Sequence, residues 1–313
     1  MRRALIAIAC SCVSFGAQAV TLSPGDILGL SAGIIRIDPT TGVQTQVAVG
    51  LFYDFAIGAD GRLYATAGDS VLRIDPADGS TSVLTSGGIL LSARSIVVAA
   101  DGRVYVSTPT TGGGSAIVGV DPATGAQQLV ASDPYGHGLR DLGITPDNRL
   151  VLLGGTRNDS SPGLLAFVAI DTGVITFTAG SGVERTGLAV SALGEIFAAD
   201  SGGQCGCTYR WDALTDQWQY LTFPPYPPGT SGSDGIFDVA VEASGSLLLA
   251  ENGADAQVYR FDPLSDRRDP ASFEVVTNGS FHQLEVVPVP EPGTALVLSL
   301  GLLILAASPL RPR

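Results

Sequence analysis

The chain has 313 residues, enough for one large domain or two small ones. Hydrophobic residues make up 45% of it and charged residues only 15%, and its 40 glycines indicate a turn-rich β protein rather than a helical or disordered one. All 17 basic residues are arginine, and against 30 acidic residues they leave a formal net charge of −13, which argues against binding to nucleic acid or anionic lipid.

The first segment is typical of a secretory signal peptide. Two arginines precede an apolar stretch over residues 4–15, and the small-residue motif AQA ends at Ala19. We therefore assign residues 1–19 to a signal peptide that is cleaved after Ala19, and we expect export through the Sec translocon. A short buried helix is the alternative interpretation.

A motif that resembles RIDPTTG then recurs six times along the chain. In each copy an aspartate follows a short apolar run and precedes a second run, and proline, glycine or aspartate stands beside it, which is hairpin-turn chemistry. The six aspartates are Asp38, Asp75, Asp121, Asp171, Asp212 and Asp262.

A second motif lies between the copies of the first. It consists of an apolar strand, a tight turn and another apolar strand, as in FAIGADGRLYAT, which starts at Phe55, and IVVAADGRVYVS, which starts at Ile96. Together the two motifs predict units of four antiparallel strands with the period of a propeller blade.

The two ends of this repeated region complement each other. The first unit, which starts at Gly25, has three predicted strands and lacks the innermost one, whereas residues 281–288 form one unmatched strand. We expect that last strand to complete the first blade and close the ring. Residues 20–288 are therefore predicted to form an all-β, six-bladed β-propeller, with seven blades as the alternative.

The strand-turn-strand units resemble those of NHL and gluconolactonase-like propellers. The segments DFAIGADGRLYAT, from Asp54, and EIFAADSGG, from Glu195, carry the resemblance. It supports the fold, but a fold of this kind hosts many unrelated functions.

Aligning the inner strands on their turns places six residues at one level near a mouth of the central channel. They are Asp54, Ser95, Asp141, Gly187, Asp238 and Gln283. The three aspartates alternate around the ring, so they could hold Ca²⁺, a hard cation that prefers oxygen ligands. The alternative is that each aspartate accepts backbone N–H bonds in its own loop.

The preceding position in each strand supplies a second set of candidates. It holds Tyr53, Arg94, Arg140, Thr186, Phe237 and His282. We take Arg94, Arg140 and His282, together with the three aspartates, as candidate binding residues at the channel mouth. Arginines beside acids more often pair with them than bind a ligand, so ion pairs are the alternative. Neither His282 nor His137, the other histidine, shows the pattern of a catalytic base beside a nucleophile.

Two further features bear on chemistry. Lactonases that resemble this fold bind a divalent metal through channel-lining side chains, and Asp200, Glu251 and Asn252 could supply only part of such a set. Cys205 and Cys207 are expected to form a local disulfide, because thiols outside the cytoplasm tend to oxidise.

The last 25 residues form a three-part tail. Pro290-Glu291-Pro292 is followed by an apolar run over residues 294–310 and by the basic ending RPR. This order resembles the PEP-CTERM sorting signal of Gram-negative bacteria, which implies recognition by the membrane protease exosortase. Residues 289–313 would then anchor the chain in the inner membrane transiently, and an ordinary C-terminal anchor is the alternative.

These features favour an exported, non-catalytic binding module. The sorting resemblance implies association with the cell surface or an extracellular matrix, and polysaccharide is one candidate partner. The alternative is a metal-dependent, lactonase-like hydrolase or lyase that works at the channel.

Overall fold

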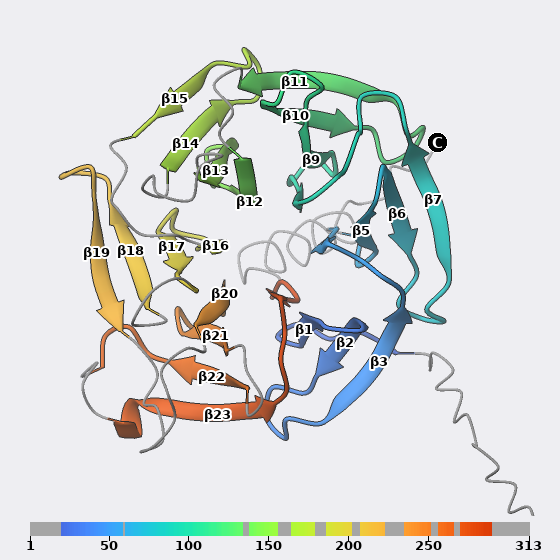
Figure 1. Cartoon of the computed structure of the whole chain (residues 1–313). Coiled ribbons are helices and arrows are strands. Elements are labelled where there is room, and N and C mark those ends of the chain that lie inside the picture. Colours follow the sequence, from blue (N-terminus) through green and yellow to red (C-terminus); the bar gives the residue numbers. More distant parts are fainter. Residues whose placement is uncertain are drawn as a thin grey trace, which may run out of the picture.

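The computed structural model of the chain is a six-bladed β-propeller, with six four-stranded sheets around a central channel (Figure 1). It describes residues 20–58, 60–133, 138–155, 164–178, 186–201, 207–222, 235–251, 256–265 and 270–289. The prediction of six blades is confirmed, and the alternative of seven is wrong.

Each blade runs through its four strands from the channel outward. Blade 1 contains β24 (Gln283–Val286), β1 (Ile27–Leu30), β2 (Gly33–Ile37) and β3 (Gln44–Val49), and blade 2 contains β4 (Asp54–Ile57), β5 (Leu63–Ala67), β6 (Ser70–Ile74) and β7 (Thr81–Ser86). Blade 3 contains β8 (Ile96–Val98), β9 (Val104–Pro109), β10 (Ser115–Val120) and β11 (Gln127–Asp133), and blade 4 contains β12 (Gly138–Ile144), β13 (Arg149–Gly155), β14 (Leu164–Ala169) and β15 (Ile175–Phe177). Blade 5 contains β16 (Gly187–Val190), β17 (Ile196–Ala199), β18 (Thr208–Asp212) and β19 (Gln217–Thr222). Blade 6 contains β20 (Ile236–Val241), β21 (Leu247–Glu251), β22 (Gln257–Phe261) and β23 (Phe273–Asn278), and a 3₁₀ turn (η1, Pro270–Ser272) precedes its last strand.

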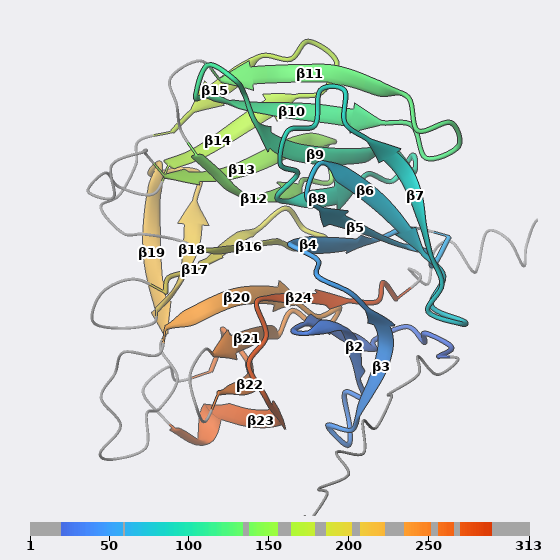
Figure 2. The same ribbon diagram turned by 45° about the vertical axis from the view of Figure 1, so that its right-hand side comes forward.

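The last strand closes the ring as the sequence predicts. β24 pairs with β1 in antiparallel register, from Ile27 opposite Val286 to Leu30 opposite Gln283. β24 also lies beside β20 of blade 6 (Figure 2). The inner edge of β1 is therefore covered, which removes a template for aggregation.

The hydrophobic core lies between the blades. Alternate side chains of each strand point to opposite faces of its sheet, and in a propeller each face packs against the neighbouring blade. Leu30 and Val47 of blade 1, for example, share a buried cluster with Phe55 and Leu63 of blade 2. Because each blade buries both faces, its inner strands are apolar almost throughout.

The repeated aspartates form the predicted turns. Asp38 Oδ1 accepts the backbone N–H groups of Thr40 and Thr41 at 3.0 and 2.9 Å, and Asp121 does the same for Ala123 and Thr124. These contacts lower the pKa of both carboxyl groups, because they stabilise the charged form.

The glycine that ends two of these turns packs against the preceding blade. Gly42 and Gly125 have positive φ angles of +68° and +72°, a conformation that other residues rarely adopt. A Cβ atom at Gly42 would also lie 2.1 Å from the carbonyl oxygen of Val276 in blade 6. The repeat thus fixes both a turn and a contact between blades.

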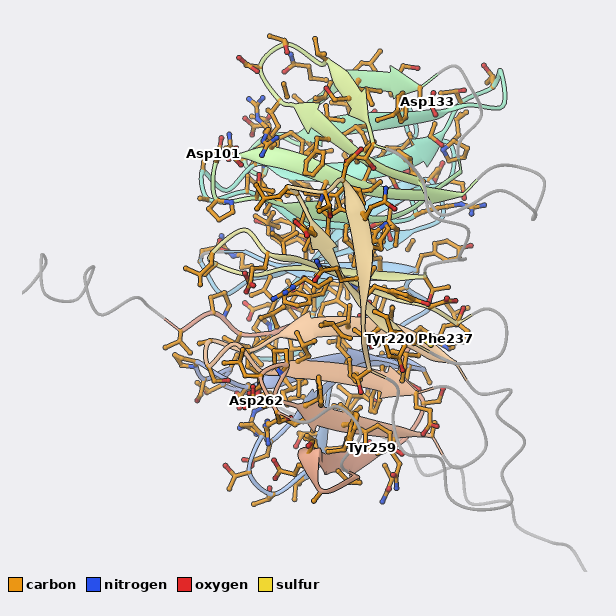
Figure 3. The ribbon with its side chains drawn as sticks, turned by 90° about the vertical axis from the view of Figure 1, so that its left-hand side faces the viewer. Asp101, Asp133, Tyr220, Phe237, Tyr259 and Asp262 are labelled. Carbon is orange, nitrogen blue, oxygen red and sulfur yellow. The ribbon has the colours of Figure 1, made fainter. Side chains whose placement is uncertain are left out.

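The molecule has two faces, which differ in their loops. The inner strands begin on one face, which we call the rim face, and end at tight turns on the other, the turn face. Figure 3 shows Asp101 and Asp262, both in turns, on one side of the disc, and Phe237 and Asp133 toward the other.

Two sequence predictions concern segments beyond the propeller. Residues 1–19 and 290–313, which contain the predicted signal peptide and sorting tail, lie outside the described residues. Among the residues that are described, no helix is long and apolar enough to cross a membrane.

Candidate binding site at the rim mouth of the channel

The three predicted aspartates lie at one level, but they join neighbouring blades rather than line an open site. Asp54, Asp141 and Asp238 are buried, with exposed fractions of 4%, 3% and 1%. One oxygen of each accepts the N–H of an inner-strand residue in the following blade: Ile96 at 2.8 Å, Leu188 at 2.7 Å and Leu284 at 2.6 Å, respectively. Each carboxylate therefore satisfies a donor on the free edge of the next innermost strand.

In the blades between these aspartates, the residues at the same level contact the carboxyl groups or leave room for them. The Ser95 hydroxyl donates to Asp141 Oδ1 at 2.9 Å and accepts the N–H of Leu142 at 2.9 Å, so it links blades 3 and 4. At Gly187 a Cβ atom would lie 2.2 Å from Asp238 Oδ1 and 2.5 Å from Asp238 Cα, so a side chain has no room there.

Burial raises the pKa of all three carboxyl groups. The pKa of Asp141 rises to about 7, and the hydrogen bonds from Leu142, Ser95 and Leu188 oppose that rise. The pKa values of Asp54 and Asp238 are raised well above the usual range, first by burial and next by the charge of Asp141. The three groups therefore repel one another when they ionise.

The donor set does not fit the predicted Ca²⁺ ion. Both oxygens of Asp54 and of Asp141 already accept hydrogen bonds, from Phe55, Ile96, Leu142, Leu188 and Ser95. Within the described part of the chain, no group of three or more acidic, histidine or cysteine side chains is arranged to hold a metal. We derive no chemistry through a metal at this level.

The preceding position forms an exposed rim above the buried carboxylates. Tyr53, Arg94, Thr186 and His282 each donate their backbone N–H to a carbonyl of the adjacent strand at 2.8–2.9 Å, which fixes their backbone. Tyr53 is 62% exposed, and the side chains of Arg94 and His282 are exposed as well. The His282 ring meets that of Phe237 edge-on, with 5.7 Å between centroids.

Arg94 differs from the expectation that the rim arginines pair with the aspartates. Arg94 forms no ion pair with another described residue, and its side chain faces solvent. Arg140 belongs to β12, but its side chain is not among those described. The rim thus presents the guanidinium group of Arg94 and the rings of Tyr53, Phe237 and His282.

Below the carboxylate level, toward the turn face, the channel contains a cavity of about 660 Å³ with both apolar and polar walls. Its walls include Leu142, Leu188 and Leu284, and the half-buried Glu285 projects among them. The pKa of Glu285 rises to about 8, through burial and then through the charge of Asp141. The sequence patterns did not single out this residue, although a lone carboxylate among apolar residues of a closing strand is visible in FHQLEVV.

The described residues do not complete the lactonase-like set of metal ligands to which Asp200, Glu251 and Asn252 could belong. Asp200 and Glu251 are buried, and the Tyr259 hydroxyl donates to Glu251 Oε2 at 3.4 Å. Asn252 and His137 lie outside the described residues.

Only one cysteine of the predicted disulfide lies among the described residues. Cys207 is fully buried and disulfide-bonded. Cys205 lies outside the described residues, so the pairing stays a prediction.

Comparison with known proteins supports the fold alone. No protein-family model matches the chain, and no curated protein matches it. A solved structure described as "Crystal structure of Nidogen/Laminin Complex" contains a similar chain, with a TM-score of 0.62 and 11% identity. The match covers 85% of this chain and 98% of that one. At this identity the likeness extends to the propeller and not to its ligands.

Proposed function

We propose that the protein is a non-catalytic binding module that uses its rim face to hold an extracellular polysaccharide with acidic groups. The observation that carries this proposal is the rim itself, where Tyr53, Phe237 and His282 lie at the same level as the exposed Arg94. Aromatic rings offer apolar area at low entropic cost, and arginine recognises carboxylates, so the combination suits a sugar chain with widely spaced carboxylates. The net charge of −13 would repel a densely charged polyanion.

The groups beneath the rim favour binding over catalysis. The three carboxylates are buried and hold backbone N–H groups of the next blade. A general acid or base must reach the substrate directly or through one water, and these carboxylates are turned into the protein. No contact among the described residues favours the alternative of a lactonase-like hydrolase or lyase.

Export and sorting form the second half of the proposal. The signal-peptide pattern and the PEP-CTERM-like tail imply passage through the Sec translocon and processing by an exosortase in a Gram-negative bacterium. The propeller would then act at the cell surface or in the matrix. The similar chain in a nidogen/laminin complex shows that such a ring can take part in an assembly of proteins.

The test combines binding with turnover. We expect the protein to bind gellan, a polysaccharide whose carboxylates are widely spaced, and not neutral dextran, without release of sugar or reducing ends. Tyr53→Ala and His282→Ala should each weaken binding roughly tenfold, which corresponds to about 1.4 kcal/mol. Leu193→Ala, on the exposed turn face, is the control and should bind as the parent does.

Two results would contradict the proposal. Equal binding of the two polysaccharides would remove the role of charge at the rim, and turnover of either would favour an enzyme. Recovery of the protein only as a full-length cytoplasmic species would end the argument for export.

A further inference from the structure

The cavity below the three aspartates is built by every blade. Residues from all six innermost strands, β24, β4, β8, β12, β16 and β20, contribute to its wall. Its lower end reaches the turn face, where the exposed Leu193 and the turn residues Ser244 and Gly245 line it. Its volume of about 660 Å³ lies within the range of roughly 300–1,000 Å³ that is typical of small-molecule sites. The cavity can therefore take a small organic ligand from the turn face.

The wall combines aliphatic side chains with backbone polar groups. Each innermost strand pairs with only one neighbour in its sheet, so its other edge faces the channel. At the upper end this edge is already occupied, as where Asp238 accepts the N–H of Leu284. Two residues further along, the same edge faces the cavity, because successive residues of a strand alternate in direction. The residues at that position, all of which line the cavity, are Val98, Ile144, Val190 and Val286. Their carbonyl oxygens can accept hydrogen bonds from a ligand.

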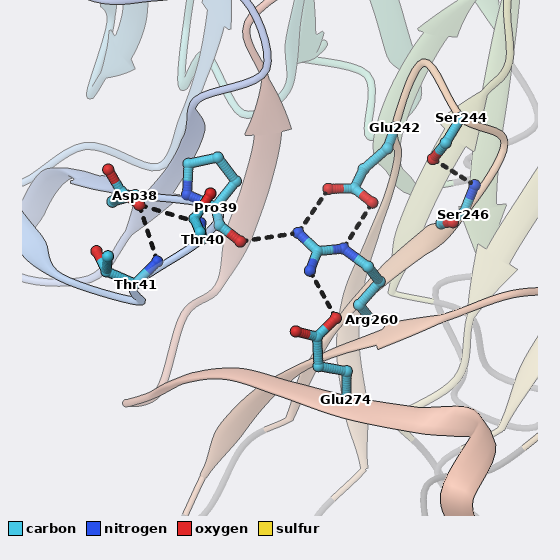
Figure 4. Close-up of polar contacts among 9 residues, drawn as sticks. All are labelled: Asp38, Pro39, Thr40, Thr41, Glu242, Ser244, Ser246, Arg260 and Glu274. Atoms are coloured by element: carbon cyan, nitrogen blue, oxygen red, sulfur yellow. Dashed lines mark hydrogen bonds and ion pairs between the residues drawn. The ribbon is translucent and has the colours of Figure 1, made fainter.

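The charged side chains of the described lining are all acidic. They are Glu195, Glu242 and Glu285, and no basic side chain is among the described residues that line the cavity. Arg260 donates to both oxygens of Glu242 at 2.8 and 3.0 Å (Figure 4), and Arg210 lies 3.6 Å from Glu195. The two carboxylates nearest the turn face are therefore balanced by arginines that lie outside the cavity.

Glu285 differs from these two carboxylates because it has no such partner. It follows Leu284, so it lies directly below the level of the three aspartates. Its half-buried side chain forms no hydrogen bond or ion pair with any other residue that the structure describes. Burial, and next the charge of Asp141, raise the pKa of Glu285 to about 8. A carboxyl group in such a place is costly to ionise unless a cation accompanies it.

We propose that this cavity binds an aliphatic primary amine as its ammonium ion, with Glu285 as the counter-ion. The ammonium group carries three donors, which would reach the Glu285 carboxylate and the channel-facing carbonyl oxygens. The aliphatic chain would lie along the apolar wall toward the turn face. The described lining contains no aromatic side chain, which disfavours quaternary ammonium ions, because their recognition relies on aromatic rings. The cavity and the rim lie on opposite sides of the carboxylate level, so the site does not depend on the polysaccharide proposal.

The test uses n-hexylamine as the probe, in calorimetric titrations of the parent protein at pH 8. We expect saturable binding, at least about tenfold tighter than that of 1-hexanol, hexanoate or hexyltrimethylammonium. These three compounds respectively lack the charge, reverse it, and remove the N–H donors. n-Butylamine should bind roughly tenfold more weakly than n-hexylamine, because it buries two CH₂ groups fewer.

Glu285→Gln removes the charge and keeps the size of the side chain. It should weaken n-hexylamine binding at least about tenfold. Glu274→Gln is the matched control, because it removes the same charge from the outer strand β23, away from the cavity. The Glu285 variant should fold, since an amide costs less to bury than a carboxylate, and its melting temperature checks this. Its gellan binding should equal that of the parent, because the rim is unchanged.

Proton release is a second readout, which a merely structural role of Glu285 would not change. At pH 7 this carboxyl group is mostly protonated in the free protein, so binding of an ammonium ion should release about one proton. Titrations in two buffers of different ionisation enthalpy measure the release. The other acidic groups above the cavity or at its lower end are Asp54, Asp141, Asp238, Glu195 and Glu242. Because Glu285→Gln keeps all of these, the fall in proton release in that variant isolates the share of Glu285.

The outcomes separate the alternatives. Absence of saturable n-hexylamine binding by the parent overturns the proposal, as does unchanged binding by folded Glu285→Gln. Equally tight binding of 1-hexanol would show that the cavity selects only for apolar area, and equally tight binding of hexyltrimethylammonium would overturn the assignment of a primary amine. If Glu285→Gln failed to fold, the ranking of the four hexyl compounds on the parent would still decide.

Discussion

The six junctions between blades fall into two alternating kinds. Three are bridged by a buried aspartate that holds an N–H of the next blade, from Asp54, Asp141 and Asp238. The others have a serine, a glycine or a glutamine at the same level. At one of them Ser95 makes a neutral version of the same link, and at another Gly187 only makes room for Asp238.

The difference shows how a ring can carry acids at its centre without becoming a metal site. Placing a carboxylate at every junction would put six mutually repelling charges at one level. Alternation separates the three carboxylates, and the absence of a side chain at Gly187 leaves room for Asp238. The arrangement stabilises the ring through hydrogen bonds while it costs free energy through burial of charge.

The largest expected effect comes from removing the closing strand, which takes the Leu284 partner from Asp238. Deletion of residues 281–288 should expose the inner edge of β1, empty the space filled by Phe281, and leave the protein insoluble. Soluble fraction and thermal denaturation measure this. A chain that stops after Val289 is the control, and a deletion that remains as soluble and heat-stable as the parent would refute closure.

The next effect tests the tight fit at a glycine junction. Gly187→Ala should destabilise the protein by about 3 kcal/mol, because the new methyl would overlap Asp238 and its backbone. Gly112→Ala is the matched control, since a Cβ there meets nothing within 4 Å. Chemical denaturation compares the two, and equal free energies of unfolding would mean that the junction is loose.

The aspartate and serine bridges should differ in strength. Asn in place of Asp141 offers one acceptor oxygen to three donors, so Asp141→Asn should cost about 2 kcal/mol. Ser95→Ala should cost about 1 kcal/mol, because it removes the hydroxyl that accepts the Leu142 N–H and donates to Asp141 but leaves both carboxylate oxygens in place. Equal losses would mean that charge adds nothing to the bridge.

The raised pKa values predict that the folded protein is more stable at acidic pH than at neutral pH. Asp141 has an ordinary unfolded pKa near 3.9 and a folded pKa of about 7, so the folded state binds more protons between those values. Stability should therefore be greatest below about pH 4 and fall, by on the order of 4 kcal/mol, as the pH rises from about 4 to 7. Melting temperatures across pH 4–8 measure this, and Asp141→Asn should flatten the curve. A rise in stability over that range would contradict the burial of these carboxyl groups.

Calcium should have the smallest effect. Because both oxygens of Asp54 and of Asp141 already accept hydrogen bonds, melting temperatures in excess Ca²⁺ and in EDTA should agree within about 1 °C. A gain of several degrees that disappears in Asp54→Asn would revive the calcium hypothesis.

The fold could be predicted because its signals are local. Turns such as that of Asp38 are encoded by adjacent residues, and alternation in each strand determines which residues face the next blade. The unmatched strand at residues 283–286 followed from counting, since an open inner edge must be covered. The level shared by Asp54, Asp141 and Asp238 followed from the same alignment.

The contacts of the site could not be predicted in the same way. Whether an aspartate at the channel points to a ligand or to the neighbouring N–H depends on the separation of two sheets, which no local pattern encodes. The predicted sorting signals and the pairing of Cys205 with Cys207 remain predictions.

The strand order of blade 1 also determines when, during synthesis of the chain, this blade can be completed. Its innermost strand is made last, whereas the three strands that need it are made first. During synthesis and any passage across a membrane, the nascent chain must therefore keep an unfinished sheet from pairing with other chains until its final segment arrives. Closure of the ring therefore requires that all six blades have been synthesised, and contact between segments so distant in sequence makes that step slow.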